Sequence, residues 1–488
     1  MTEATDKHDE ILSRAEQKKT PLYADRVKVF PKAVSGRWRQ IKWAALILLL
    51  TVYYVTPWLR WDRGPGVPDQ AVLIDLGNRR AYYFFIEIWP QEVYYLTGIL
   101  ILAAVGLFLA TSLFGRIWCG YACPQTAWTD LFMWVERLVE GDRSARIRLD
   151  KSPMSGAKLV KRAVKHGIWL LIALLTGGAW MMYFQDAPTF VAEFFTGQSS
   201  FTVYFFVGLF TATTYLLAGW AREQVCTYMC PWPRIQSALL DEESLVVTYR
   251  DWRGEPRGPH KKGQSWDGRG DCIDCKQCVA ACPMGIDIRD GIQLECIGCG
   301  LCIDACDEIM DRVERPRGLI AFDTEKRMQA KHADPSCAGP RPRPVRPRTI
   351  VYVVVLAIVA AIMAVGLSGR SSEDMTVLHD RAPLFVTLSD GSVRNGYEIK
   401  VLNKTHEPRT YTLTVTGLAD PRFQVVGMDG VMSAPVTLTA PADSVAEFQV
   451  YVSVAPDSID GDTVPVTFVL TESETGETTS IDDVFRGP

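Results

Sequence analysis

Hydrophobic residues gather in five stretches of the chain that contain no Lys, Arg, Asp or Glu. They cover residues 43–59, 93–114, 167–185, 201–220 and 349–367. Each stretch is close to the ~20 residues that an α-helix needs to cross a bilayer. A buried core helix is the alternative for any single stretch, but five of this length favour a membrane protein with five helical spans. We do not expect a cleaved signal peptide, because a long polar segment precedes the first stretch.

The hydrophobic pattern changes to a period of two after residue 370. Alternating segments occur at residues 397–405, 409–418, 434–440, 446–454 and 463–471, separated by Asn, Asp, Gly and Pro. This pattern predicts an immunoglobulin-like β-sandwich at 371–488. Met375 and His379 are possible metal ligands in it, although such residues are more often ordinary surface or core side chains. Apolar runs around Gly77-Asn78 predict a short hairpin within 60–92.

Charge divides the chain and predicts its orientation. The formal net charge is −4, yet residues 371–488 carry 7 Lys/Arg and 18 Asp/Glu. Residues 1–42 and 115–166 hold 10 Lys/Arg each, 60–92 hold 4 and 186–200 hold none. Since basic loops stay on the cytoplasmic side, we expect the N-terminus and 221–348 in the cytoplasm and the C-terminal domain in the periplasm.

Two cysteine runs between residues 272 and 306 carry the most specific chemistry. Each has the spacing Cys-x2-Cys-x2-Cys-x3-Cys, and Pro283 follows the first run. This is the bacterial ferredoxin spacing, in which the fourth Cys of each run binds the other run's 4Fe-4S cluster. The expected sets of ligands are Cys272, Cys275, Cys278 and Cys306 for one cluster, and Cys282, Cys296, Cys299 and Cys302 for the other. A pair of zinc knuckles is the alternative, but it gives no reason for the x3 spacing before Pro.

A second cysteine motif is repeated at the cytoplasmic ends of two predicted spans. Cys119 and Cys123 follow the second span, whereas Cys226 and Cys230 follow the fourth, each pair in the form Cys-x3-Cys-Pro. Thiols four residues apart on a helix share a face and can reach one metal. The following Pro suits a new helix, which predicts Cys123 and Cys230 as N-cap residues whose thiolates the helix end favours.

Four sulfur ligands from the two pairs would select Cu(I), zinc or an iron–sulfur cluster. The residue pattern leaves the choice open between a metal site, a dithiol relay, ligands of a further cluster and buried structural thiols. Cys337 stands alone in a linker rich in Pro and Arg.

The predicted organisation is a multi-domain membrane protein with an inserted α+β domain and an all-β C-terminal domain. Basic Pro/Gly-rich linkers bound the insert, and their charge suits topology and anionic lipid rather than nucleic acid. The predicted parts are a cytoplasmic segment at 1–42, a membrane domain with four spans at 43–254, a two-cluster ferredoxin-like domain at 255–325, a basic linker at 326–348, the fifth span at 349–367 and the periplasmic sandwich at 371–488.

The assembled features resemble the cytochrome c oxidase accessory protein family, known as CcoG, FixG or RdxA. The similarity extends over nearly the whole chain after residue 25. It rests on VKVFPKAVSGRWRQIKW, GRIWCGYACPQTAWTDLFMWVERLVEGDR, CTYMCPWPRIQSALLDEESLVVTYRDWRGEPRG, CIDCKQCVAACPMGIDIRDGIQLECIGCGLCIDACD and VLHDRAPLFVTLSDGSVRNGYEIKVLNKT. Asp307 departs from the ferredoxin pattern, where Pro would follow the fourth Cys, but it replaces no ligand.

The resemblance implies a bacterial inner-membrane cupric reductase, an oxidoreductase that makes Cu(I) for a haem–copper cytochrome c oxidase. It implies two 4Fe-4S clusters, and it links Cys119, Cys123, Cys226 and Cys230 to copper. Implied partners are copper ion, the oxidase assembly machinery and a copper transporter, with an electron donor that the sequence does not reveal. The alternatives are an electron-transfer subunit of another respiratory reductase and a non-enzymatic scaffold that holds copper.

Overall fold

The computed structural model describes residues 28–487, apart from residues 65, 262, 371–372, 429, 456–458 and 460. The described residues belong to two compact units. The membrane–ferredoxin unit lies within Met1–Trp58, Ile74–Arg80 and Ile99–Ala357. The C-terminal unit lies within Leu59–Leu73, Ala81–Gly98 and Ile358–Pro488.

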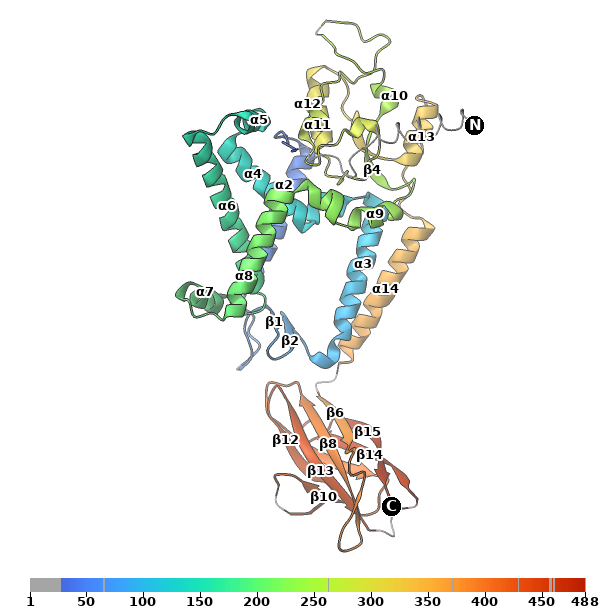
Figure 1. Ribbon diagram of the computed structural model, residues 1–488. Helices are drawn as coiled ribbons and strands as arrows, with labels where there is room; N and C mark the ends of the chain where they lie inside the picture. Colours follow the sequence, from blue (N-terminus) through green and yellow to red (C-terminus); the bar gives the residue numbers. More distant parts are fainter. Residues whose placement is uncertain are drawn as a thin grey trace, which may run out of the picture. The chain divides into compact units, whose positions relative to one another are not determined.

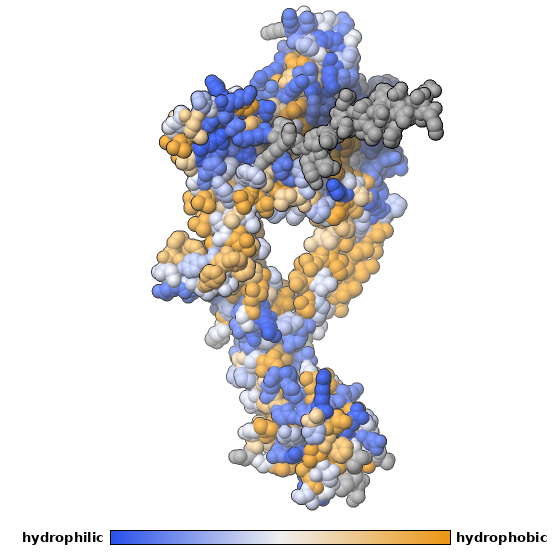
Figure 2. All heavy atoms as spheres, in the orientation of Figure 1, coloured by the Kyte–Doolittle hydropathy of each residue, from blue (hydrophilic) through white to orange (hydrophobic). Residues whose placement is uncertain are grey.

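Five helices are long and apolar enough to cross a membrane, as predicted. Hydrophobic side chains cover much of their outer surfaces, as a lipid environment requires (Figure 2). The helix α8 packs against α6, and α3 runs beside α14, with the rings of Phe108 and Tyr352 6.3 Å apart (Figure 1). The helices are α2 (Arg37–Val55), α3 (Tyr94–Phe114), α6 (Gly156–Met181), α8 (Phe201–Thr214, continued as a π-helix to Ala221) and α14 (Pro347–Ser368).

An amphipathic helix, α4 (Pro124–Glu140), joins the first cysteine motif to the spans. Its side chains Phe132 and Val135 are buried against Trp169 of α6, and the rings of Phe132 and Trp169 stack with centroids 5.2 Å apart. The short helices α5 (Arg143–Lys151) and α7 (Ala187–Thr196) complete the connections between spans. The apolar face of α4 therefore holds the first motif beside α6 and α8.

The ferredoxin-like part forms its own core beside the spans. Strands β4 (Leu245–Tyr249) and β5 (Ile320–Thr324) pair antiparallel, and α11 (Gln277–Ala281) packs against α12 (Leu301–Arg312). Val247 and Tyr249 share a core with Cys272 and Cys278. The folded domain thus includes a strand that precedes the predicted start at residue 255. Flanking helices are α9 (Trp232–Leu239), α10 (Asp251–Gly254) and α13 (Glu325–Ala333).

The carboxylate of Asp304, which lies between two cysteines of the second run, caps the N-terminus of α2. It accepts hydrogen bonds from the backbone N–H groups of Trp38 at 3.2 Å and Arg39 at 2.8 Å. The first turn of a helix leaves N–H groups unsatisfied and carries a partial positive charge, so a buried carboxylate stabilises it. The ferredoxin-like part is therefore attached directly to the first span.

The C-terminal unit contains the predicted β-sandwich. One sheet has the order β11-β10-β13-β8-β6, with β7 beside β8, and the other has the order β12-β9-β14-β15. Alternate side chains of both sheets form the core, among them Tyr397, Tyr411 and Phe468. The strands are β6 (Glu373–His379), β7 (Val386–Thr387), β8 (Val393–Asn403), β9 (Arg409–Thr416), β10 (Arg422–Val425), β11 (Met432–Ser433), β12 (Val436–Ala440), β13 (Ser444–Val454), β14 (Thr463–Glu472) and β15 (Thr478–Arg486).

The predicted hairpin after the first span is also present. Strands β1 (Val72–Asp75), β2 (Arg80–Tyr83) and β3 (Ile86–Ile88) form a small sheet in that order, and the turn between the first two contains Gly77-Asn78.

Candidate functional site

The two predicted sets of ferredoxin cysteines line two neighbouring cavities. Cys272, Cys275, Cys278 and Cys306 line the first cavity. Cys282, Cys296, Cys299 and Cys302 line the second. Cys278 borders both cavities. The fold thus brings the fourth cysteine of each run to the other run, as the spacing predicts.

The cysteines in these cavities are better suited to binding a cationic metal centre than to remaining as thiols without one. Burial raises the pKa of Cys278 and Cys296 to about 11 and that of Cys282 to about 12. A cluster of buried thiolates is unfavourable without a cation, and an iron–sulfur core supplies that charge. Backbone N–H groups of Met284 and Ile286 donate hydrogen bonds to Cys282, a contact that tunes cluster potential. The residues present therefore fit two iron–sulfur clusters.

The first Cys-x3-Cys-Pro motif lies on a π-helix rather than on the predicted α-helix. The π-helix Trp118–Ala122 ends where Cys123 donates its N–H to the carbonyl of Trp118 at 2.8 Å. Cys123 is then the N-cap of α4, with Pro124 at its first position, as predicted.

The second motif repeats this arrangement with one difference. The π-helix Val225–Met229 ends at Cys230, but the N-cap of α9 is Pro231. The prediction of Cys230 as an N-cap is therefore wrong by one residue. It failed because Pro231, which already has helical backbone angles, separates Cys230 from the first residue of α9, Trp232.

The four thiols of the two motifs lie close enough to interact. Burial is the main cause that raises the pKa of Cys226 to about 12, and Cys123, Cys119 and Cys230 raise it further. Burial likewise raises the pKa of Cys119, with smaller contributions from Cys123 and Cys230. The fold thus brings together the two pairs, which lie about 100 residues apart in the chain.

The sulfur atoms are not gathered around one point. Among the described residues, no three of these four sulfurs lie within 4.8 Å of one another. Sulfurs bound to one ion at ~2.3 Å would be about 3.8 Å apart, so a single ion with three sulfur ligands would need side-chain movement. The ferredoxin sulfurs show the same wider separation, because the corners of a cubane are farther apart than the ligands of one ion.

Cys119 has a polar environment that sequence analysis did not predict. Its Sγ donates a hydrogen bond to Oε1 of Gln236 at 3.1 Å, and a guanidinium nitrogen of Arg116 lies 4.0 Å away. The same Gln236 oxygen accepts a hydrogen bond from Arg116 at 3.1 Å. The position of Arg116 just before the motif was visible in the sequence, but nothing marked Gln236, which comes from α9.

The first motif packs directly on the second ferredoxin run. The Tyr121 hydroxyl donates a hydrogen bond to the carbonyl of Cys299 at 3.0 Å, and Arg116 donates one to the carbonyl of Leu294. A Cβ at Gly120 would lie 2.9 Å from the carbonyl oxygen of Ile297, so only glycine fits this approach. The cavity of Cys282, Cys296, Cys299 and Cys302 is thus the one nearer to Cys119.

The second motif is held by a buried network of charges. Arg222, which precedes Cys226, forms an ion pair with Glu136 of α4 and donates to the carbonyl of Gly219 at 2.8 Å. Arg146 of α5 binds the other oxygen of Glu136 at 2.8 Å. Gln125 of α4 also donates to the carbonyls of Leu217 and Arg222. Helix α4 therefore begins at one motif and positions the other.

Met375 and His379 do not form a metal site. Met375 is 2 % exposed in the sandwich core. Both ring nitrogens of His379 are hydrogen-bonded at 2.7 Å, one to Asn395 and one to the carbonyl of Asp380. The structure therefore supports the alternative interpretation, in which Met375 is a core residue and His379 is a hydrogen-bonded side chain.

Three segments of the chain match known protein families. Residues 221–325 match a 4Fe-4S dicluster domain family, and residues 96–141 match a 4Fe-4S binding domain family. Residues 363–488 match the family of the IG-like fold at the C-terminal of FixG. The FixG-related protein from Vibrio parahaemolyticus, a crystal structure, is 25 % identical over 24 % of this chain and 97 % of that chain, with a TM-score of 0.21.

Similar proteins extend over most of the chain. The nitrogen fixation protein FixG of Rhizobium meliloti is 50 % identical over 458 residues, which are 89 % of this chain and 87 % of that protein. The proteins RdxB and RdxA of Cereibacter sphaeroides are also 50 % identical. Their alignments cover 88 % and 86 % of this chain and 90 % and 88 % of the relatives. The chain therefore belongs to the FixG family of membrane iron–sulfur proteins.

Proposed function

We propose that this protein is a cupric reductase, which reduces Cu(II) to Cu(I) for the assembly of a haem–copper cytochrome c oxidase. The proposal assigns copper, as the substrate, to Cys119, Cys123, Cys226 and Cys230. The observation that carries it is the packing of the first motif against the second ferredoxin run, through Gly120 and Tyr121. That contact supports the proposal, because thiols able to bind soft metal ions would then lie next to a centre suited to electron transfer.

The proposed cluster ligands are the two sets that line the cavities: Cys272, Cys275, Cys278 and Cys306, and Cys282, Cys296, Cys299 and Cys302. A bound 4Fe-4S cluster supplies one electron at a time, which is the number that Cu(II) needs to become Cu(I). The electron enters from an unidentified cytoplasmic donor. The cavity of Cys299 is the nearer of the two to the copper thiols.

The residues around Cys119 orient its thiol and compensate charge. The thiol must lose its proton, to solvent, to bind copper, and Gln236 orients the S–H group by accepting its hydrogen bond. The guanidinium of Arg116 then compensates the charge of the thiolate. Thiolate ligands favour Cu(I) over Cu(II), so the site stabilises the product of the reduction.

The proposed location is the bacterial inner membrane, with the N-terminus and the clusters in the cytoplasm and the C-terminal unit in the periplasm. The distribution of Lys and Arg among the loops supports this orientation. The proposed partners are a copper transporter and the oxidase assembly machinery.

The test compares copper reduction by cluster-loaded variants of the full chain in detergent. The chemically reduced protein receives Cu(II), and loss of the Cu(II) EPR signal is followed with a Cu(I) chelator present. We expect replacement of the four membrane-edge cysteines by Ser to abolish the fast phase. Cys337→Ser is the matched control, because Cys337 lies outside both motifs and donates to the carbonyl of Ala330. Equal rates in the quadruple variant and in the control would refute the site.

Two observations favour a second candidate, an electron-transfer subunit of another respiratory reductase. The matched 4Fe-4S binding family covers residues 96–141, which include Cys119 and Cys123. The wide separation of the four sulfurs also suits a cluster better than one ion. Iron analysis separates the two functions, because two clusters require about eight iron atoms per chain and a third cluster about twelve. Loss of about four iron atoms in the quadruple Ser variant would favour this candidate.

A further inference from the structure

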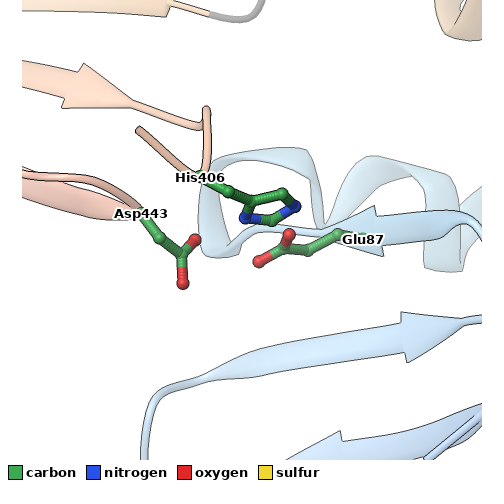
Figure 3. Close-up of side chains that lie close together, drawn as sticks. All are labelled: Glu87, His406 and Asp443. Carbon is green, nitrogen blue, oxygen red and sulfur yellow. The ribbon is translucent and has the colours of Figure 1, made fainter. Parts of the chain in front are cut away.

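Three ligand-type side chains meet in the C-terminal unit at a place that the proposed function does not use. Glu87, His406 and Asp443 each offer one ligand atom, and these atoms lie within 4.8 Å of one another. Figure 3 shows the imidazole of His406 beside the carboxylates of Glu87 and Asp443. We propose that these residues bind one divalent transition-metal ion of the Zn²⁺ or Cu²⁺ class.

The three residues come from three separate segments of the unit. Glu87 lies on β3 and is 8 % exposed, His406 lies in the loop between β8 and β9, and Asp443 directly precedes β13. An ion bound here fastens the segment that precedes α3 to one end of the sandwich.

The loops that carry His406 and Asp443 are held firmly. The N–H of Asp443 donates to the carbonyl of Thr405 at 2.8 Å. The backbone φ of Asp443 is 51°, in a region that residues other than Gly rarely adopt. Asn403 is fully buried and donates to the carbonyls of Glu407 and Pro441, so it ties one loop to the other. Locked neighbours are a feature of a preorganised ligand site.

The imidazole itself points to a ligand. The Nδ1 atom of His406 is buried and has no hydrogen-bond partner among the residues that the structure describes. A buried ring nitrogen without a partner is unfavourable, and coordination to a metal would satisfy it.

The donor set defines the class of ion. One imidazole with two carboxylates suits Zn²⁺ and Cu²⁺, whereas Mg²⁺ and Ca²⁺ prefer oxygen alone and Cu(I) prefers sulfur. Ligands of one ion at ~2.0–2.1 Å stand about 3.3 Å apart, so small side-chain rotations would close the site. The inference is independent of copper reduction at the four cysteines.

The test measures Zn²⁺ bound to the full, cluster-loaded chain after equilibrium dialysis, by elemental analysis. Thiol sites contribute equally to all variants, so the differences between variants carry the result. We expect His406→Ala and Glu87→Gln each to bind one Zn²⁺ fewer per chain than the wild type. Glu87→Gln keeps the shape of the side chain, so it remains informative if His406→Ala folds poorly.

The matched control is His332→Ala, which removes an exposed imidazole from the other unit. This variant is expected to bind as much Zn²⁺ as the wild type. Zn²⁺ is also expected to raise the melting temperature of the C-terminal unit in the wild type but not in His406→Ala. Equal Zn²⁺ contents in the wild type, His406→Ala and Glu87→Gln would overturn the proposal. Copper reduction is expected to be unchanged in both variants.

Discussion

Replacement of Glu136 by Gln tests whether the buried charge network holds the membrane-edge site together. The Glu136 side chain is 6 % exposed and faces Arg146, Arg222 and Lys165, which are 1 %, 9 % and 3 % exposed. Amide substitution keeps the shape of the side chain but leaves three buried cations without that carboxylate. Glu140, which pairs with Lys165 at 3.0 Å, remains to compensate part of their charge.

The expected loss of stability follows from the distances. A pair at the 2.8 Å between Glu136 and Arg146 has a Coulomb energy of about 6 kcal/mol at an effective dielectric constant of ~20. Desolvation of both groups offsets much of this energy, and removal of one partner from a buried pair generally costs about 3–5 kcal/mol. Since Gln retains an oxygen acceptor and Glu140 remains, we expect the free energy of unfolding to fall by about 3 kcal/mol.

The assay is a denaturant titration of the full chain in detergent, followed by circular dichroism of the helices. The control is Asp311→Asn, because Asp311 pairs with Arg317 at 2.6 Å on an exposed surface and its removal should not change the midpoint. The double variant Glu136→Gln/Arg146→Gln should recover part of the loss, because it removes one uncompensated cation. A Glu136→Gln protein as stable as the Asp311→Asn control would refute the reasoning.

Three further predictions concern the same unit. Burial alone would raise the pKa of Glu136, but Arg222 and the other cationic neighbours of Glu136 outweigh burial and hold this pKa below the ordinary value. The difference in stability between wild type and Glu136→Gln should therefore persist above pH ~4.3 and vanish as the pH falls through the lowered pKa. Unfolding midpoints measured against pH check this prediction. Gly120→Ala should slow copper reduction, because the added Cβ would push against a backbone carbonyl of the second ferredoxin run. Gly106→Ala should leave the rate of copper reduction unchanged, because the added Cβ meets no atom within 4 Å. Asp304→Ala should lower the free energy of unfolding by about 2 kcal/mol through loss of two hydrogen bonds to the start of α2, and an unchanged unfolding midpoint would contradict this role.

Local features of the chain could be predicted because their physics is local. A stretch of ~20 apolar residues must span a bilayer as a helix, since only a helix satisfies its own backbone groups there. Alternation with a period of two marked five of the sandwich strands, including β8 and β13. It did not mark β10, which alternates but has only four residues, or β15, where polar side chains interrupt the apolar positions. The ferredoxin spacing likewise predicted both sets of cavity-lining cysteines.

The sequence by itself thus determined the spans, five of the sandwich strands and the two cysteine motifs, because each depends on neighbours within a few residues. Only the tertiary structure placed Gly120 against the second ferredoxin run, Gln236 beside Cys119, and Glu136 between Arg146 and Arg222. Only the fold gathered Glu87, His406 and Asp443, which lie as far as about 350 residues apart in the chain. No local pattern marks such partners, because their proximity results from the packing of whole helices and sheets, and packing depends on the entire chain at once.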